Sequence, residues 1–478
     1  MGAPSRAVLW LASLLASPLG AAAQRPPAPD SVDRFVIAEM RRQRIPGLAV
    51  AVVSRGRVVK ARGYGFANVE LRVTATDSTV FQSGSVGKQF TAAGVLLLVE
   101  DGKLGLDDAI TKYLPEGDTV WRGVTVRHLL THTAGIHEYE EDADSSLVDL
   151  RHDYGEDDLV RVAARHALDF APGTRWSYSN TGYMLLGAII HRVSGKFYGD
   201  LLSERVFKPL GMATARVISE ADIVHNRADG YRLVDGQLKN QEWVAPSLNT
   251  TADGALYLTV RDLAAWDRGL TQGRILSPKS RTAMWTPAKL SGDGSVDYGF
   301  GWRLAPYRGH RAIGHTGSWQ GFKALIQRFP DDSLTVIVLA NLAEARPLPI
   351  GYGVAGVYRR GLVPPHALSA SPDSVLSGRL VAFLRSLATP TDSGASAARG
   401  FRDTLLPQDG RSLADLLADH PLTTFHGCDD VTRLEVERHG VRLARSCYLA
   451  VAGKDGPSLI TFWLGARGEV ADVSDYSY

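Results

Sequence analysis

Cysteine and methionine are scarce in this chain, and neither sign of charge dominates it. Among 478 residues there are 2 cysteines and 5 methionines, and the formal net charge is +2. No basic block or basic-aromatic stripe is present, which argues against a nucleic-acid partner. The cysteines fit no zinc-ligand spacing and no histidine-rich pattern accompanies them, so we expect no metal and no cofactor.

Long apolar runs are also missing beyond the N-terminus. Residues 1–23 combine Arg6, a short apolar stretch and the small residues Ala21 and Ala23, which is the pattern of a secretory signal peptide. The stretch is short for a membrane span and contains Pro18; an uncleaved anchor is the alternative. We expect export, with a periplasmic or secreted chain cleaved near Ala23 and no membrane span in the mature protein.

What is present is an ordinary globular composition, with 45% hydrophobic and 22% charged residues. Apolar spacing predicts a helix over 31–44, and β-rich runs flank a turn at Arg55 and Gly56. Helices are predicted over 85–100 and 180–193, followed by β runs within 312–341. This order predicts an α+β fold, in which a central antiparallel sheet is flanked by helices and joined to a mostly helical subdomain.

A change of composition near 362–372 indicates a linker between a first domain, 24–363, and a small α+β accessory domain, 373–478. A helix is predicted over 375–387, and short β runs are predicted over 422–425, 433–437, 441–451, 458–464 and 470–478. In an exported protein the pair Cys428 and Cys447 is a candidate disulfide.

Ser85 and Lys88 stand three residues apart at the start of a predicted helix, in "SVGK". Positions i and i+3 share one helix face, so the lysine amine can reach the serine Oγ and take its proton. Burial would favour the neutral amine that this needs. The alternative is that Ser85 caps the helix and Lys88 faces solvent. Ser-x-x-Lys alone does not decide between the two.

Two further segments place polar groups at element boundaries. Tyr178 and Asn180 in "YSN" are two apart before a helix and can face one cleft, although a capping Asn180 and a packed tyrosine are the alternative.

In "HTGS", His315, Thr316, Gly317 and Ser318 predict a strand edge with a glycine at a close approach. A backbone N–H there could donate to an oxyanion. A β-bulge glycine beside a structural histidine is the alternative.

Together these motifs resemble the penicillin-recognising serine hydrolases, closest to the class C β-lactamase and D-alanyl-D-alanine carboxypeptidase-like superfamily. "LLLVEDGKLGLDDAITKYLP", "VTVRHLLTHTAGI", "ADGALYLTVRDLAAW" and "YGFGW" agree with it. The resemblance covers roughly residues 30–360.

The resemblance implies acyl transfer. Ser85 would attack a carbonyl, Lys88 and Tyr178 would move its proton to the leaving group, and Asn180 would orient Lys88 and the substrate amide. The N–H groups of Ser85 and Ser318 would form the oxyanion hole, and water would release the acyl group.

His315 departs from the lysine that many β-lactamases of this group carry. A histidine is mostly neutral near pH 7 and attracts a carboxylate less strongly. If His315 anchors a carboxylate, KM for carboxylated substrates should rise between about pH 5.5 and 8.

Other residues are interpreted as structural. We expect His132 to be a hydrogen-bonded loop residue, and Tyr298 and Trp302 to pack near the cleft. The acidic residues of the 137–158 segment are expected to form a solvated loop face: Glu138, Glu140, Glu141, Asp142 and Asp144.

The leading hypothesis is an exported serine hydrolase acting on an ester or amide, such as a D-amino-acid-containing peptide, with a small molecule or short peptide as its partner. A β-lactamase is the second hypothesis. A non-catalytic ligand-binding or sensor module is the third, and intact proton-relay residues argue against it. The sequence leaves the oligomeric state open.

Overall fold

The computed structural model describes residues 30–139, 148–292, 294–365, 370–388, 423–438, 441–451 and 458–477. The predicted signal peptide lies outside them. The helices are α1 Ser31–Gln43, α2 Lys88–Glu100, α3 Val126–Leu130, α4 Glu156–Ala163, α5 Asn180–Ser194, α6 Tyr198–Leu202, α7 Lys208–Leu210, α8 Val260–Thr271, α9 Pro278–Met284, α10 Pro347–Tyr358 and α11 Ser374–Ala388. No helix in these ranges is long and apolar enough to cross a membrane.

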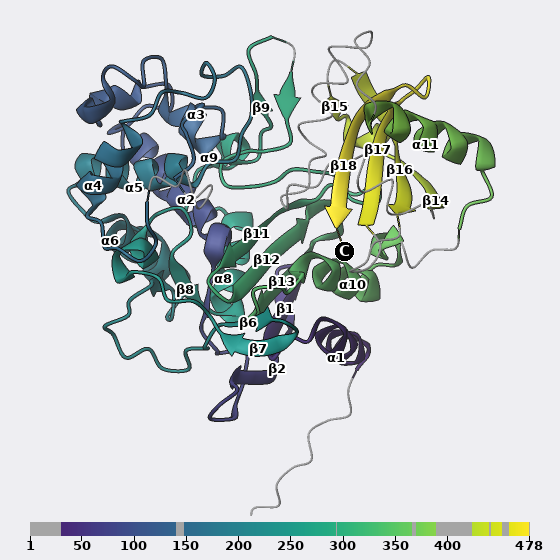
Figure 1. Cartoon of the computed structure of the whole chain (residues 1–478), viewed down its shortest axis with the longest axis horizontal. Helices are drawn as coiled ribbons and strands as arrows, with labels where there is room; N and C mark the ends of the chain where they lie inside the picture. Colours follow the sequence, from purple (N-terminus) through teal and green to yellow (C-terminus); the bar gives the residue numbers. More distant parts are fainter. Residues whose placement is uncertain are drawn as a thin grey trace, which may run out of the picture.

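A six-stranded sheet forms the centre of the N-terminal domain (Figure 1). In spatial order its strands are β11 Ile313–Trp319, β12 Phe322–Phe329, β13 Leu334–Ala340, β1 Gly47–Ser54, β2 Arg57–Asn68 and β3 Val73–Thr74. Every neighbouring pair is antiparallel. Strands from both ends of the domain therefore meet at its middle, where β13 pairs with β1, as the sequence predicted.

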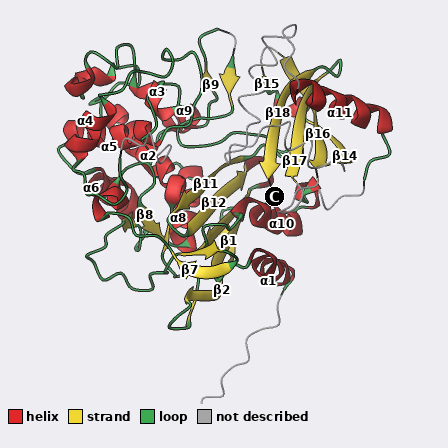
Figure 2. Cartoon of the chain, viewed as in Figure 1, coloured by secondary structure: helices red, strands yellow, loops and turns green. Residues whose placement is uncertain are grey.

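The middle strands are buried on both faces, so they read as continuous apolar runs. In β1, Leu48, Val50 and Val52 pack in a cluster with residues of α1 and α10, whereas Ala49 and Ala51 face the cluster that contains α8. The sheet is thus the middle layer between two helical layers (Figure 2).

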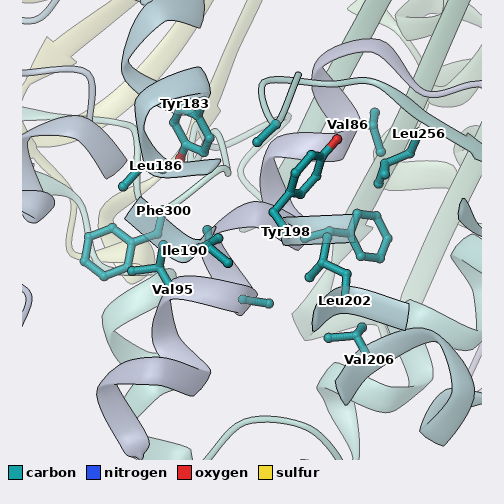
Figure 3. Packing of buried hydrophobic residues seen from close by; sticks show 14 of the residues in the cluster. Val86, Val95, Tyr183, Leu186, Ile190, Tyr198, Leu202, Val206, Leu256 and Phe300 are labelled. Carbon is teal, nitrogen blue, oxygen red and sulfur yellow. The ribbon is translucent and has the colours of Figure 1, made fainter. Parts of the chain in front are cut away.

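The chain between β3 and β11 supplies the mostly helical subdomain. Helix α5 packs against α2, α3, α4 and α6, and Figure 3 shows part of the shared core, in which Val95, Tyr183, Ile190 and Leu202 belong to one buried cluster. The predicted fold class is confirmed. The 3₁₀ turn Gly84–Gly87 just before α2 contacts β11 and β12, so the start of α2 lies where the subdomain meets the sheet.

The remaining strands of this domain are short. A three-stranded sheet contains β4 Phe81–Gln82, β8 Leu256–Leu258 and β5 Arg216–Val217, and two hairpins contain β6 Tyr231–Val234 with β7 Gln237–Asn240 and β9 Ala288–Lys289 with β10 Ser295–Val296. Strand β4 leads directly into the turn that contains Ser85.

Residues 370–388, 423–438, 441–451 and 458–477, here called the C-terminal unit, form a helix and an antiparallel sheet with a separate apolar core. Its strands are β14 Thr423–Asp430, β16 Val441–Val451, β17 Ser458–Gly465 and β18 Val470–Ser477, with β15 Glu437–Arg438 paired to β16. Cys428 and Cys447 face each other across β14 and β16 and form a disulfide.

One predicted strand of this unit is wrong in its first part. Residues 433–437 were expected to form a β run, but Thr432–Leu434 is a 3₁₀ turn and only Glu437–Arg438 pairs with β16. Glu435 has φ 53°, a left-handed conformation that interrupts an extended strand.

Candidate active site

Ser85 lies in a 3₁₀ turn, Gly84–Gly87, that immediately precedes α2. Gly84 has φ 47°, and a Cβ on it would approach the Ser318 nitrogen to 2.5 Å. Only glycine permits this close approach of the turn to the edge strand β11. Ser85 is partly exposed and lines a pocket together with Asn180, Gly254, Ser318 and other residues.

Lys88 is the first residue of α2 and is completely buried. Its Nζ donates to Ser85 Oγ at 3.2 Å, to Asn180 Oδ1 at 2.6 Å and to the Asp253 carbonyl oxygen at 2.6 Å. The alternative of a solvent-facing lysine is therefore wrong. Ser85 is also not a helix cap, because the turn begins after Ser83. The Ser-x-x-Lys spacing brings amine and hydroxyl together as the helix geometry predicts.

Tyr178 lies beside the same amine. Lys88 Nζ is 4.9 Å from the centre of the Tyr178 ring, a distance at which a cation is attracted to the π face. The phenol Oη is buried, and within the described residues it has no hydrogen-bond partner. A buried hydroxyl without a partner is costly, and an incoming substrate or leaving group could satisfy it.

Asn180 is the first residue of α5, and its backbone N–H is held by Glu138, a residue that we had expected on a solvated loop face. Glu138 is buried, and its carboxylate accepts the backbone N–H groups of Asn180 and Tyr139. The expectation that Glu138 belongs to a solvated face is corrected here, because a carboxylate at a helix N-terminus is stabilised by the backbone donors there. The other four acidic residues of that run, Glu140, Glu141, Asp142 and Asp144, lie outside the described residues.

The "HTGS" segment is the edge strand β11, as predicted. A Cβ on Gly317 would lie 2.0 Å from the Ser83 carbonyl oxygen and 3.1 Å from the Ser85 nitrogen, so the glycine allows β11 to touch the turn before α2. The backbone nitrogens of Ser85 and Ser318 consequently lie at the same contact. Thr316 is partly exposed on this strand, and Lys323 Nζ donates to Ser318 Oγ at 2.7 Å.

His315 is buried, and both of its ring nitrogens are engaged inside the protein. Nδ1 donates to the Thr316 carbonyl at 2.5 Å, which leaves Nε2 to accept from the Tyr298 hydroxyl at 2.9 Å. Burial, reinforced by the nearby Arg303 and Lys88 charges, lowers the pKa of His315 to about 3. The expectation that this residue changes charge near neutral pH is thereby corrected.

A flat pH profile follows from this pKa. His315 stays neutral between about pH 5.5 and 8, so KM for carboxylated substrates should not change with its titration in that range. Since folding depresses the pKa, the neutral ring contributes stability that is present above about pH 6.5 and is lost as the pH falls toward the folded pKa. Steady-state kinetics of wild type and His315→Gln test this. A KM rise in wild type that is absent from the variant would contradict it.

Aromatic rings pack around Tyr178. His132 is buried, accepts the Ser179 N–H at Nδ1 over 3.1 Å, and lies 4.4 Å from the Tyr178 ring centre. The Tyr298 ring centre lies 4.7 Å from that of His132. The structural interpretation of His132 and Tyr298 is confirmed, and His132 holds the segment that carries Tyr178.

Sequence reasoning missed Asp253 as well as the role of Glu138. The Asp253 carbonyl accepts from Lys88, while its carboxylate accepts from the Tyr139 hydroxyl at 3.0 Å. Glu138 lies in no motif, and Asp253 lies within "ADGALYLTVRDLAAW", where the sequence analysis gave it no role, so burial against the site identifies both. Among the described residues, no group of three or more His, Cys, Asp or Glu side chains is placed to hold a metal ion.

Comparison with known proteins adds independent evidence. The family model described as Beta-lactamase matches residues 32–351. Penicillin-binding protein 4* of Bacillus subtilis is 31% identical over 314 residues, covering 62% of this chain and 68% of that protein. A D-aminopeptidase of Gluconobacter oxydans is 29% identical over 333 residues, and this match spans 68% of this chain but 62% of the relative's length.

Solved structures agree on the fold. The octameric penicillin-binding protein homologue from Pyrococcus abyssi has a TM-score of 0.61 at 24% identity, covering 94% of this chain and 95% of that one. A D-amino acid amidase from Ochrobactrum anthropi has a TM-score of 0.58 at 26% identity, covering 70% of this chain and 98% of that one. Since the matching family model covers most of the chain, the protein belongs to the beta-lactamase family of serine hydrolases.

Proposed function

We propose that this protein is an exported hydrolase that cleaves an amide or ester next to a D-amino acid, through an acyl-enzyme on Ser85. The observation on which this depends is the single buried amine of Lys88, which contacts both Ser85 Oγ and Asn180 Oδ1. A buried amine in contact with a hydroxyl is the arrangement that an activated serine needs. The names of two relatives, D-aminopeptidase and D-amino acid amidase, support the substrate class.

The acylation step follows from the positions of these groups. In the reactive state Lys88 is a neutral amine, which donates its two N–H groups to Asn180 Oδ1 and the Asp253 carbonyl and accepts from Ser85 Oγ instead of donating to it. Ser85 Oγ then transfers its proton to Nζ as it bonds to the carbonyl carbon. The oxyanion that forms would be stabilised by the N–H groups of Ser85 and Ser318 at the contact of the turn with β11. The proton then passes, directly or through the Tyr178 hydroxyl, to the departing nitrogen or oxygen as its bond to carbon breaks.

Deacylation uses the same groups in reverse. Water gives a proton to the neutral Lys88 amine, directly or through the Tyr178 hydroxyl as a relay, while its oxygen attacks the ester carbonyl, and Lys88 returns a proton to Ser85 Oγ as it leaves. Asn180 would orient the Lys88 amine throughout, because its Oδ1 accepts from Nζ.

A panel of substrates tests the proposal. We expect turnover of D-alanine p-nitroanilide and D-amino acid amides well above that of the L enantiomers, with slower or no turnover of a chromogenic cephalosporin. Matched D and L substrates carry the same leaving group, so only the acyl stereochemistry differs. Rapid cephalosporin hydrolysis would instead favour a β-lactamase, and reversible binding without acylation would favour a sensor. Sequencing of the mature N-terminus after expression in a Gram-negative host tests export.

A further inference from the structure

The C-terminal unit contacts the N-terminal domain beside the active site, through Arg438 of β15. The Arg438 side chain is 8% exposed and forms ion pairs with Asp297 of the N-terminal domain and with Asp472 of β18. Its guanidinium carbon lies 4.4 Å from the Trp463 ring centre. The neighbouring Ser295 hydroxyl donates to the Glu437 carbonyl at 3.4 Å. A buried arginine thus links two carboxylates across the contact between the two parts.

Asp297 is adjacent in sequence to a wall residue of the active site. The next residue, Tyr298, donates its hydroxyl to His315 Nε2, and its ring lies 6.4 Å from that of Tyr178. The Asp297 carbonyl also accepts the N–H of Leu304 at 2.9 Å, which closes a loop over residues 297–304. A shift of Asp297 would therefore move Tyr298 within the aromatic wall.

The same loop packs against the start of α2. Gly301 has φ 75°, and a Cβ on it would lie 2.9 Å from the carbonyl carbon and oxygen of Lys88. The loop backbone and the Lys88 backbone are accordingly in direct contact. Loop 297–304 supports both the Tyr178 ring, through Tyr298, and the residue that carries the amine.

We propose that Arg438 is a positioning residue for the active site, and that the C-terminal unit is part of the scaffold that keeps the catalytic groups in their relative positions. Through Asp297 it fixes loop 297–304, and through this loop it fixes Tyr298 and the backbone at Lys88. Only the expected change in kcat rests on the proposed hydrolase function; the effect of Arg438 on the position of the loop does not. Removing one partner of a buried ion pair leaves the other charge uncompensated, so the loop is expected to move or admit water when Arg438 is lost.

The test compares Arg438→Gln with wild type in the full chain. Because small displacements of catalytic groups lower rates strongly, we expect kcat to fall by about tenfold or more, with a much smaller change in KM. The fraction of molecules labelled by a fluorophosphonate at saturation should stay at the wild-type value. A merely structural loss of folded enzyme would lower that fraction instead, so this readout separates the two effects.

The chain offers a matched control in Arg433. It lies in the same unit and donates to the Gly309 carbonyl at 2.7 and 3.2 Å, outside loop 297–304. Arg433→Gln should leave kcat within about twofold of wild type. Arg438→Lys, which keeps the charge but not the two-pronged geometry, should recover part of the rate. The double variant Asp297→Asn with Arg438→Gln should be no slower than the slower single variant, because both act through one contact.

Hydrogen exchange measured by mass spectrometry gives an answer that does not depend on activity. Peptides covering 297–304 should exchange faster in Arg438→Gln than in wild type. Their exchange rate in Arg433→Gln should equal that of wild type. If wild type neither reacts with the probe nor hydrolyses any substrate, the proposed function fails while the exchange result still decides the role of Arg438. Unchanged exchange in these peptides, or an equal loss of kcat in Arg433→Gln, would overturn the proposal.

Discussion

Replacing Ser85 with alanine is expected to abolish covalent labelling by a fluorophosphonate and to lower kcat/KM by at least about 10⁴-fold, the scale seen when a nucleophile is removed from a serine hydrolase. The reason is that Ser85 Oγ is the hydroxyl in contact with the buried Lys88 amine. Intact-mass spectrometry after incubation with the probe measures the labelling, and substrate hydrolysis measures the rate.

Ser83 gives a nearby control for this variant. It is a buried serine whose hydroxyl donates to the Gly254 carbonyl at 2.7 Å and not to Lys88. Ser83→Ala should remain labelled, with the adduct found on the peptide that contains Ser85. An adduct that persists in Ser85→Ala would show that another residue is the nucleophile.

Lys88→Met is expected to have the second largest effect, a loss of about 10²- to 10⁴-fold in the acylation rate, as for removal of a general base. The methionine side chain is unbranched and similar in length to lysine, so it can occupy the buried site, but it has no amine. The Asn180 Oδ1 and the Asp253 carbonyl then lose a donor, which costs about 1–3 kcal/mol for each group left without a partner. Stopped-flow measurement of probe attachment gives the acylation rate, and thermal unfolding gives the loss of stability.

Lys88→Arg distinguishes the two ways in which this residue could act. Arginine keeps a positive charge but does not give up its proton in proteins, so it cannot serve as a base. We expect this variant to be as slow as Lys88→Met. An arginine variant that retained most of the acylation rate would mean that Lys88 acts through its charge alone, and the proton of Ser85 would then need another acceptor, for which Tyr178 is a candidate.

Local spacing explains why much of the site could be predicted. Ser85 and Lys88 are one helical turn apart, so their contact follows from helix geometry once the turn forms. The β runs predicted within 312–341 are strands of the central sheet, and Gly317 predicted a close approach on an edge strand. The Ser85–Lys88 distance is set by neighbours in sequence, the strand and the close approach were recognised from local apolar and glycine patterns, and the resemblance of the motifs supplied the roles.

Burial could not be predicted in the same way. Glu138 stands at the head of an acidic run, and such a run is ordinarily solvated, yet its carboxylate is held by the N-terminus of α5, more than forty residues later. His315 was expected to titrate near neutral pH because its pKa was taken from an exposed histidine. Its actual environment, including Arg303 and Lys88, comes from segments distant in the chain.

Periodicity and short-range spacing were enough to predict the fold class and the contact within the Ser-x-x-Lys pair, whereas Tyr178 and Asn180 were identified as its partners by the resemblance of the motifs. The folded chain was needed to show that Lys88 is buried among three hydrogen-bond partners, that His315 is neutral, and that Arg438 reaches Asp297 beside the active site. The physical reason is that protonation state and the position of a loop depend on which distant groups exclude water from a side chain, and chain folding alone brings those groups together.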